Sequence, residues 1–134
     1  MEEQIYQFDK GLPGFEEYRK FALLDMGEEP FSYLQSIDDM NVSFMLVNPF
    51  VFYPDYEFEL SDPEAAELGI DDQVSVRNMV TIQEPLEQST INLLAPLVLN
   101  PVKRTAKQIV LHQSSYQTRH LLLNSSLSIH RKEK

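Results

Sequence analysis

The sequence contains no cysteine among its 134 residues. These residues can therefore form no disulfide bond, and they supply neither a thiol nucleophile nor a thiolate ligand for a metal. Such a chain fits a reducing cytosol, so we expect a cytoplasmic protein. Long apolar runs are missing too, because the longest, Leu93–Leu99, has seven residues and includes a proline. A transmembrane helix needs about 20 apolar residues, so we expect no membrane span. The acidic start of the chain is followed by no apolar stretch, which predicts no secretory signal.

Glycine and histidine are scarce, and neither forms a recognisable motif. The four glycines fall at predicted turns or helix ends, outside any nucleotide-binding or nucleophile-elbow pattern. His112, His120 and His130 are eight and ten residues apart, which does not place two metal ligands on one face of a short element. We therefore expect no metal, no cofactor and no enzymatic activity. A hydrolase that uses two carboxylates stays open as an alternative, because acidic residues are abundant.

Basic residues are scarce in the first two thirds of the chain. Residues 1–90 hold four bases and 20 acids, a net charge of −16, whereas residues 91–134 hold seven bases and one acid, a net charge of +6. An acidic surface repels nucleic acid and attracts basic proteins, so we expect a protein partner and no direct binding of nucleic acid or of a membrane. Alternatively, the two halves fold together and neutralise each other.

The residues that are present predict a β-rich domain. Hydrophobic residues make up 43% of the chain, enough for one core. Short segments rich in aromatic and branched residues alternate with turn residues, which is typical of an antiparallel barrel or sandwich. The expected strands are Gln4–Phe8, Lys20–Asp25, Ser32–Ile37, Val42–Asn48, Tyr56–Leu60, Val74–Gln83, Thr90–Asn100, Lys107–Gln113 and His120–Leu123.

One segment predicts a helix instead. Ser61 is a good N-cap, Pro63 suits the first turn, and Gly69 suits the C-terminal end. The expected fold class is therefore all-β and mainly antiparallel, a small barrel-like or sandwich-like domain over residues 1–124 with one short helix near residues 62–68. Residues 125–134 lose periodicity and gain basic charge, so we expect a frayed tail.

The expected strand at residues 55–60 alternates acidic and apolar side chains. Asp55, Glu57 and Glu59 share one face at intervals of about 6.8 Å, and the apolar residues share the other face. This acidic row either prevents edge-to-edge pairing with other sheets or docks a basic protein.

Two prolines mark further candidate surfaces. Asn48 and Pro49 predict a turn, and the aromatic residues that follow, Phe50 first, belong either to the core or to an exposed binding patch. Pro96 lies inside an expected strand and cannot donate to a ladder, which predicts a bulge or an edge open to a partner peptide.

Several of these segments, in this order, resemble a known family. Gly11-Leu12-Pro13-Gly14-Phe15-Glu16, Asn48-Pro49-Phe50, Pro54-Asp55-Tyr56 and the stretch from Ser89 to Asn100 are similar to the flagellar assembly factor FliW family. The resemblance covers about residues 4–123. It implies a small β-barrel-like domain without enzymatic activity.

The resemblance also implies partners. A FliW-like protein would be a cytoplasmic regulator that binds flagellin and, when flagellin is exported, binds the RNA-binding repressor CsrA as a non-competitive antagonist, so that flagellin translation resumes. The alternative is an acidic nucleic-acid mimic that directly blocks a basic RNA-binding or DNA-binding site. We expect a monomer when no partner is bound.

The acidic row, two further acids in a loop and the two proline segments supply the expected contacts. For CsrA we expect the acidic residues Asp55, Glu57, Glu59, Asp71 and Asp72. For flagellin we expect Asn48, Pro49, Phe50 and Pro96.

Overall fold

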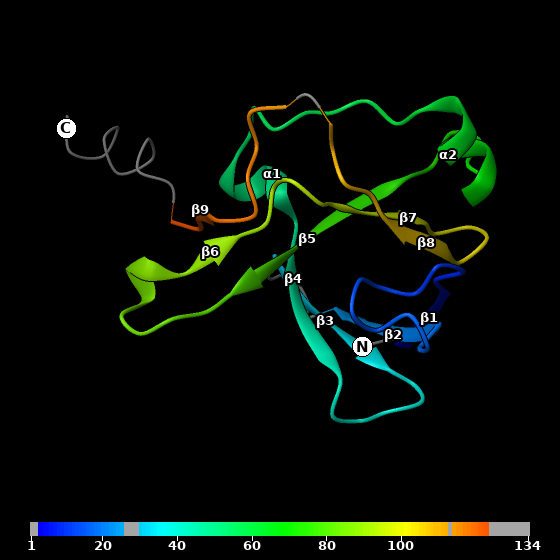
Figure 1. The fold of residues 1–134 in the computed structure, drawn as a ribbon, viewed down its shortest axis with the longest axis horizontal. Coiled ribbons are helices and arrows are strands. Elements are labelled where there is room, and N and C mark those ends of the chain that lie inside the picture. The colour runs from blue at the N-terminus through cyan, green and yellow to red at the C-terminus, as the bar shows by residue number, and fades with distance from the viewer. Residues whose placement is uncertain (1–2, 26–29, 113, 124–134) are drawn as a thin grey trace.

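A computed structural model describes residues 3–25, 30–112 and 114–123 of the chain. The described residues form nine strands and two short α-helices (Figure 1). The strands are β1 (Glu3–Gln7), β2 (Lys20–Asp25), β3 (Phe31–Ser36), β4 (Ser43–Val47), β5 (Ser75–Thr81), β6 (Thr90–Ile91), β7 (Leu97–Asn100), β8 (Thr105–Gln108) and β9 (His120–Leu121). The helices are α1 (Pro49–Phe52) and α2 (Asp62–Leu68), and a single 3₁₀ turn covers Leu86–Gln88.

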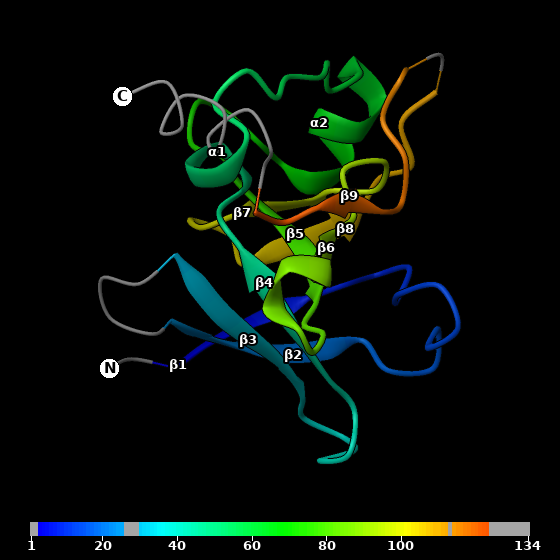
Figure 2. The same ribbon diagram turned by 90° about the vertical axis from the view of Figure 1, so that its left-hand side faces the viewer.

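Seven of the strands close into a barrel. Their order is β4-β3-β2-β1-β8-β7-β5, and β5 pairs back onto β4 through Leu46–Met79 and Val47–Asn78. All of these pairings are antiparallel except β1 with β8, which is parallel and consists of the single pair Gln7–Thr105. The short strands β6 and β9 extend from the far end of β5 (Figure 2). The expected small, mainly antiparallel β-barrel is confirmed.

Three apolar clusters hold the fold together. The barrel core consists of alternate residues from the strands and the first turn: Tyr6, Phe8, Leu12, Phe21, Leu23, Leu34, Leu46, Leu97, Leu99 and Ala106. A second cluster beneath α1 contains Val47, Tyr56, Ile91, Leu93 and Leu122. A third joins Leu68 of α2 to Val98 and Ile109 on the outer face of the barrel. β7 is therefore buried on both of its faces.

The predicted helix near residues 62–68 is confirmed, together with its caps. The Ser61 side chain accepts a hydrogen bond from the Glu64 backbone at 3.3 Å, and Gly69 adopts a left-handed φ of 68° at the other end. A second helix, α1, was not predicted. Asn48 caps it by accepting a 3.0 Å hydrogen bond from the Phe50 N–H, and Pro49 occupies its first turn. One turn of helix is too short for a periodic pattern, so Asn-Pro alone predicted only a turn.

Three strand predictions were wrong, one of them in its bounds, because the strand expected at Lys107–Gln113 is β8 at Thr105–Gln108. Residues 55–60 form no ladder with any described strand. Residues 90–100 split into β6 and β7, because the Asn92 side chain accepts hydrogen bonds from the N–H groups of Leu94 and Ala95 at 3.1 and 3.0 Å. This local turn competes with the ladder and explains the break. The expected tail, residues 125–134, lies outside the described residues.

Candidate protein-interaction site

Residues 55–60, here called the acidic segment, run over the outside of the barrel between α1 and α2. Tyr56 is buried, and Phe58 and Leu60 are partly buried, whereas Asp55, Glu57 and Glu59 are exposed. The predicted division into an apolar and an acidic face is therefore confirmed, although the strand is not. Side-chain packing, and not a hydrogen-bonded ladder, keeps the segment in place.

Tyr56 anchors this segment to the barrel. Its hydroxyl donates a 2.7 Å hydrogen bond to the Leu93 carbonyl and accepts a 3.2 Å hydrogen bond from the side-chain amide of buried Asn78. Burial raises the pKa of Tyr56 to about 12, so the phenol stays protonated and remains a donor at neutral pH. The ring also packs edge-on against Tyr116, with the ring centroids 4.8 Å apart.

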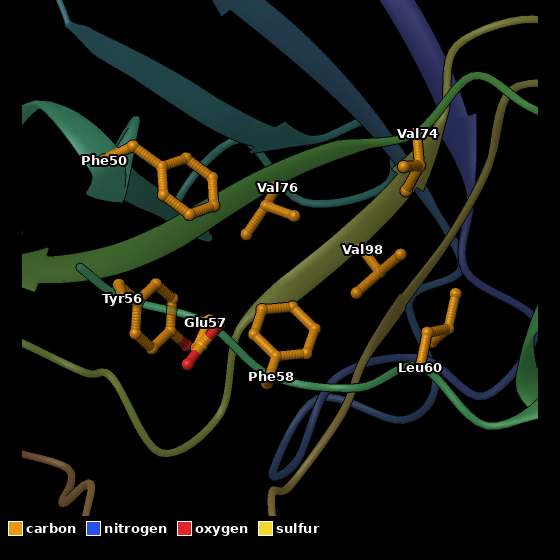
Figure 3. A pocket seen from close by; sticks show the side chains of 8 residues that line it. All are labelled: Phe50, Tyr56, Glu57, Phe58, Leu60, Val74, Val76 and Val98. Carbon is orange, nitrogen blue, oxygen red and sulfur yellow. The ribbon is translucent and has the colours of Figure 1, made fainter. Parts of the chain in front are cut away.

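An apolar groove lies between the acidic segment and β5 (Figure 3). Its volume is about 280 Å³, and its lining consists of Phe50, Tyr56, Glu57, Phe58, Leu60, Val74, Val76 and Val98. Glu57 is the only charged residue in this lining. Pockets for drug-sized ligands occupy about 300–1,000 Å³, so the groove suits a few side chains of a partner better than a small molecule.

The residues expected to bind flagellin have different positions. Phe50, which is 42% exposed, forms one end of the groove, with its ring centroid 5.9 Å from that of Tyr56. Asn48 is half-buried and Pro49 is buried, so both hold α1, and with it Phe50, in place. Pro96 is buried as well, and the strand that follows it, β7, is paired on both sides. The expected open edge at Pro96 was therefore wrong.

Asp71 and Asp72 do not lie in the same hollow as the acidic segment. Both are exposed, between α2 and β5, and they line a separate hollow of about 190 Å³ that also includes Lys103. The groove residue Val74 follows in the same loop. These two acids are therefore placed beyond one end of the groove, on the β5 side.

Local charge neutralisation occurs at α2. Within the described residues, the ion pairs are Lys107 with Glu67 at 3.0 Å, Lys107 with Glu64 at 3.8 Å, and Lys10 with Glu67 at 3.7 Å. The hydrogen bond from Lys107 lowers the pKa of Glu67. No ion pair in this part of the chain includes Asp55, Glu57 or Glu59. No described base therefore neutralises the carboxylates of the acidic segment. In contrast, Lys107 of the C-terminal third does pair with acids of residues 1–90.

The sequence did not identify the second wall of the groove. This wall consists of Val76 in β5, Val74 just before that strand, and Val98, whose side chain points outward from β7. Leu97, Val98 and Leu99 are all apolar, so alternation does not single out an outer face of β7. Nothing in the local pattern showed that this wall lies opposite Phe58 and Leu60.

Aromatic residues and a histidine gather behind the acidic segment. The hollow beside Asp55 is lined by Tyr53, Pro54, Tyr56, Leu93, Tyr116 and His120. The His120 ring lies 6.0 Å from Tyr53 and 6.2 Å from Tyr116, centroid to centroid, and burial lowers the His120 pKa. The Tyr53 hydroxyl donates to the Leu121 carbonyl, which ties α1 to β9.

The described residues contain neither a cluster of metal ligands nor a membrane-spanning helix. Over residues 3–25, 30–112 and 114–123, no group of three or more potential ligand residues is arranged to hold a metal ion. In the same residues, no helix is long and apolar enough to cross a membrane.

These observations define a small mixed β-barrel protein whose surface suits binding to another macromolecule. The chain belongs to the FliW protein family, whose profile matches residues 1–122. It is 47% identical to the flagellar assembly factor FliW of Bacillus subtilis (strain 168), over 89% of this chain and 85% of that protein. It is 40% identical to the protein of the same name from Bacillus velezensis, with 90% and 87% coverage.

A solved structure shows the same fold. The crystal structure of a flagellar assembly factor FliW superposes with a TM-score of 0.84 at 37% identity, over 89% of this chain and 85% of that one. The resemblance inferred from the sequence motifs is thereby confirmed. The family consists of assembly factors and not of enzymes, as expected.

Proposed function

We propose that this chain is a cytoplasmic flagellar assembly factor that binds flagellin and, once flagellin is exported, binds CsrA. In this scheme it antagonises CsrA non-competitively and relieves the repression of flagellin translation. The observation that carries the proposal is the acidic segment, whose carboxylates face solvent beside an apolar groove. The names of the relatives, flagellar assembly factors, support the cellular process.

The acidic segment fits a basic partner. Asp55, Glu57 and Glu59 are exposed and unpaired with any described cation, so their field extends into solvent. A protein that binds RNA carries basic surface, and charges of opposite sign speed its association with an acidic surface. Asp71 and Asp72 would add to this field from the loop before β5.

The apolar groove fits a less charged partner such as an apolar face of flagellin. Phe50 is its most accessible aromatic residue, and Asn48 and Pro49 act by fixing the helix that carries it. Buried Pro96 would contribute only through the fold, by its place before β7.

The experiment that tests the CsrA assignment is a charge reversal. Glu57→Lys with Glu59→Lys should slow association with CsrA and flatten its dependence on salt, because steering acts through exposed charge. The matched control is Glu84→Lys with Glu87→Lys, which changes two other exposed acids by the same total charge. Stopped-flow association at several salt concentrations measures both. Equal association rates for the two variants would remove the acidic segment from the CsrA site.

Competition between RNA and this protein for CsrA distinguishes a nucleic-acid mimic from a non-competitive antagonist. A mimic occupies the RNA site of its partner, so excess RNA should displace it and dissociate the complex. A non-competitive antagonist binds elsewhere, and its complex should form on CsrA whose RNA site is already occupied.

A further inference from the structure

The backbone of the acidic segment is unpaired from Phe58 to Leu60. Within the described residues, no hydrogen bond reaches the backbone N–H or C=O groups of Phe58, Glu59 or Leu60. The Glu57 N–H is donated to the Tyr116 hydroxyl at 3.2 Å. In an extended chain, the backbone groups of successive residues point to opposite sides. The groups of Phe58 and Leu60 therefore point away from Tyr116.

The side chains of the segment form one wall of the apolar groove. Figure 3 shows Tyr56, Phe58 and Leu60 on one side of the groove, opposite Phe50, Val76 and Val74. From Tyr56 to Leu60 an extended chain covers about 13 Å, which is room for two or three inward side chains of a neighbouring strand. A strand hydrogen-bonded to Phe58 and Leu60 would lie about 4.8 Å away and would direct those side chains into the groove.

The opposite face of such a strand would meet carboxylates. Glu57 and Glu59 are exposed, and neither pairs with a cation in the part of the chain that the structure describes. Directly opposed charges of opposite sign stabilise neighbouring strands, and like charges destabilise them. The added strand should thus carry Lys or Arg on its outer face, and a second copy of this acidic segment is disfavoured.

From this geometry we propose that residues 57–60 are a site of β-strand addition. The occupant is an extended segment of a basic protein in which apolar and basic residues alternate. Main-chain hydrogen bonds supply affinity in this mode, and the groove selects the alternate side chains. This proposal rests on the proposed function and adds how a partner segment is held. Its test uses neither flagellin nor CsrA, so strand addition and the proposed function can fail independently of each other.

The test uses a synthetic eight-residue probe that alternates valine and lysine, with blocked ends. The unmodified protein should bind it, and hydrogen exchange at the amides of Phe58 and Leu60, followed by NMR, should slow. An analogue N-methylated on the amides that face the segment should bind about tenfold more weakly for each hydrogen bond removed. Equal affinity of the methylated analogue would overturn the proposal, because adsorption of apolar side chains alone would explain it.

Protein variants locate the probe. Val74→Ser should weaken binding because it removes an apolar wall, whereas Met40→Ser, at a residue 75% exposed in the turn between β3 and β4, should not. Tighter binding of a helical peptide of the same composition would overturn the extended mode. Slow exchange at Phe58 and Leu60 without any probe would also overturn the proposal. If exchange were slow at all protein concentrations, the occupant would be another segment of this chain. If it were slow only at high concentration, the occupant would be a second copy of the protein.

Discussion

At the scale of single residues, Tyr56 connects the surface to the interior. Its ring forms part of the groove wall, while its hydroxyl lies among buried polar groups. The Asn78 amide nitrogen also donates to the Asn92 carbonyl at 2.7 Å, so Tyr56, Asn78 and two carbonyls form one network. Such buried polar groups fix the position of the acidic segment more sharply than apolar contacts can.

The Tyr56 hydroxyl should matter for stability. Tyr56→Phe leaves the Leu93 carbonyl without its donor and removes a partner of Asn78, so we expect the free energy of unfolding to fall by about 1–3 kcal/mol. Urea denaturation measures the change. Tyr33→Phe is the control, since Tyr33 is 37% exposed and its hydroxyl has no hydrogen bond in the described structure. An equal effect of both variants would contradict the role of the network.

His120 should make stability depend on pH. Burial lowers its pKa in the folded protein, and its Nε2 accepts a 2.9 Å hydrogen bond from the Gln117 N–H, which requires the neutral ring. The unfolded chain therefore binds a proton first as pH falls below about 6.5. Stability should be complete above that pH and should decrease as pH falls towards the lowered folded pKa.

Denaturation between about pH 7.5 and 5 measures this effect. His120→Asn should flatten the curve in that interval. A curve for His120→Asn as steep as that of the original protein would contradict the assignment.

At the scale of elements, turns with a left-handed glycine fix how strands and helices follow one another. Gly11, Gly14 and Gly69 have φ values of 63°, 83° and 68°. An added Cβ would lie 2.6 Å from the Glu16 backbone at Gly11 and 2.9 Å from the flexible Lys103 side chain at Gly69. At Gly14 it would meet no atom of the described residues within 4 Å.

Alanine substitutions at these glycines should differ in cost. Gly14→Ala should cost about 1–2 kcal/mol for the backbone conformation alone, and Gly69→Ala only slightly more, because Lys103 can move aside. Gly11→Ala should be the most destabilising, since backbone atoms must shift. Thermal or urea unfolding of the three variants gives the order. A cost at Gly11 no larger than at Gly14 would contradict the close approach of Gly11 to the Glu16 backbone.

The elements that could be predicted from the sequence are those whose signals are local. Lys20–Asp25 was predicted with the bounds that the structure shows, because it is a short apolar run that ends at turn residues. The helix near residues 62–68 was predicted because its caps are local. The acidic segment shows the same alternation as a strand, yet forms no ladder. Alternation reports burial on one face, and it carries no information on whether a neighbouring backbone is present.

At the scale of the whole molecule, the barrel brings distant segments into one surface. The groove joins α1, the acidic segment, β5 and β7. Only the Phe50 end and the acidic row were predicted as binding residues. The β5 and β7 walls follow from the pairing of β5 with β4, which closes the barrel and rests on contacts between remote strands.

Flagellin binding tests this surface as a unit. Phe50→Ala should lower the affinity for flagellin, because Phe50 is the exposed aromatic end of the groove, while circular dichroism should show an intact fold. Calorimetric titration with flagellin measures the loss, and Met40→Ala serves as the control at an exposed residue of another loop. Unchanged affinity in a folded Phe50→Ala protein would exclude Phe50 from the flagellin site.

The amino-acid sequence was sufficient to predict the class of fold, the short capped helix, the strong acidity of residues 1–90 and the family. Each of these depends on local alternation, local capping, charge counts or the order of motifs, all of which can be read along the chain. Three features could be known only from the folded chain: Pro96 is buried, residues 55–60 lack a ladder, and Val76 of β5 and Val98 of β7 face Phe58 and Leu60. Those features depend on which remote strands pair, and pairing is selected by the packing of the whole core.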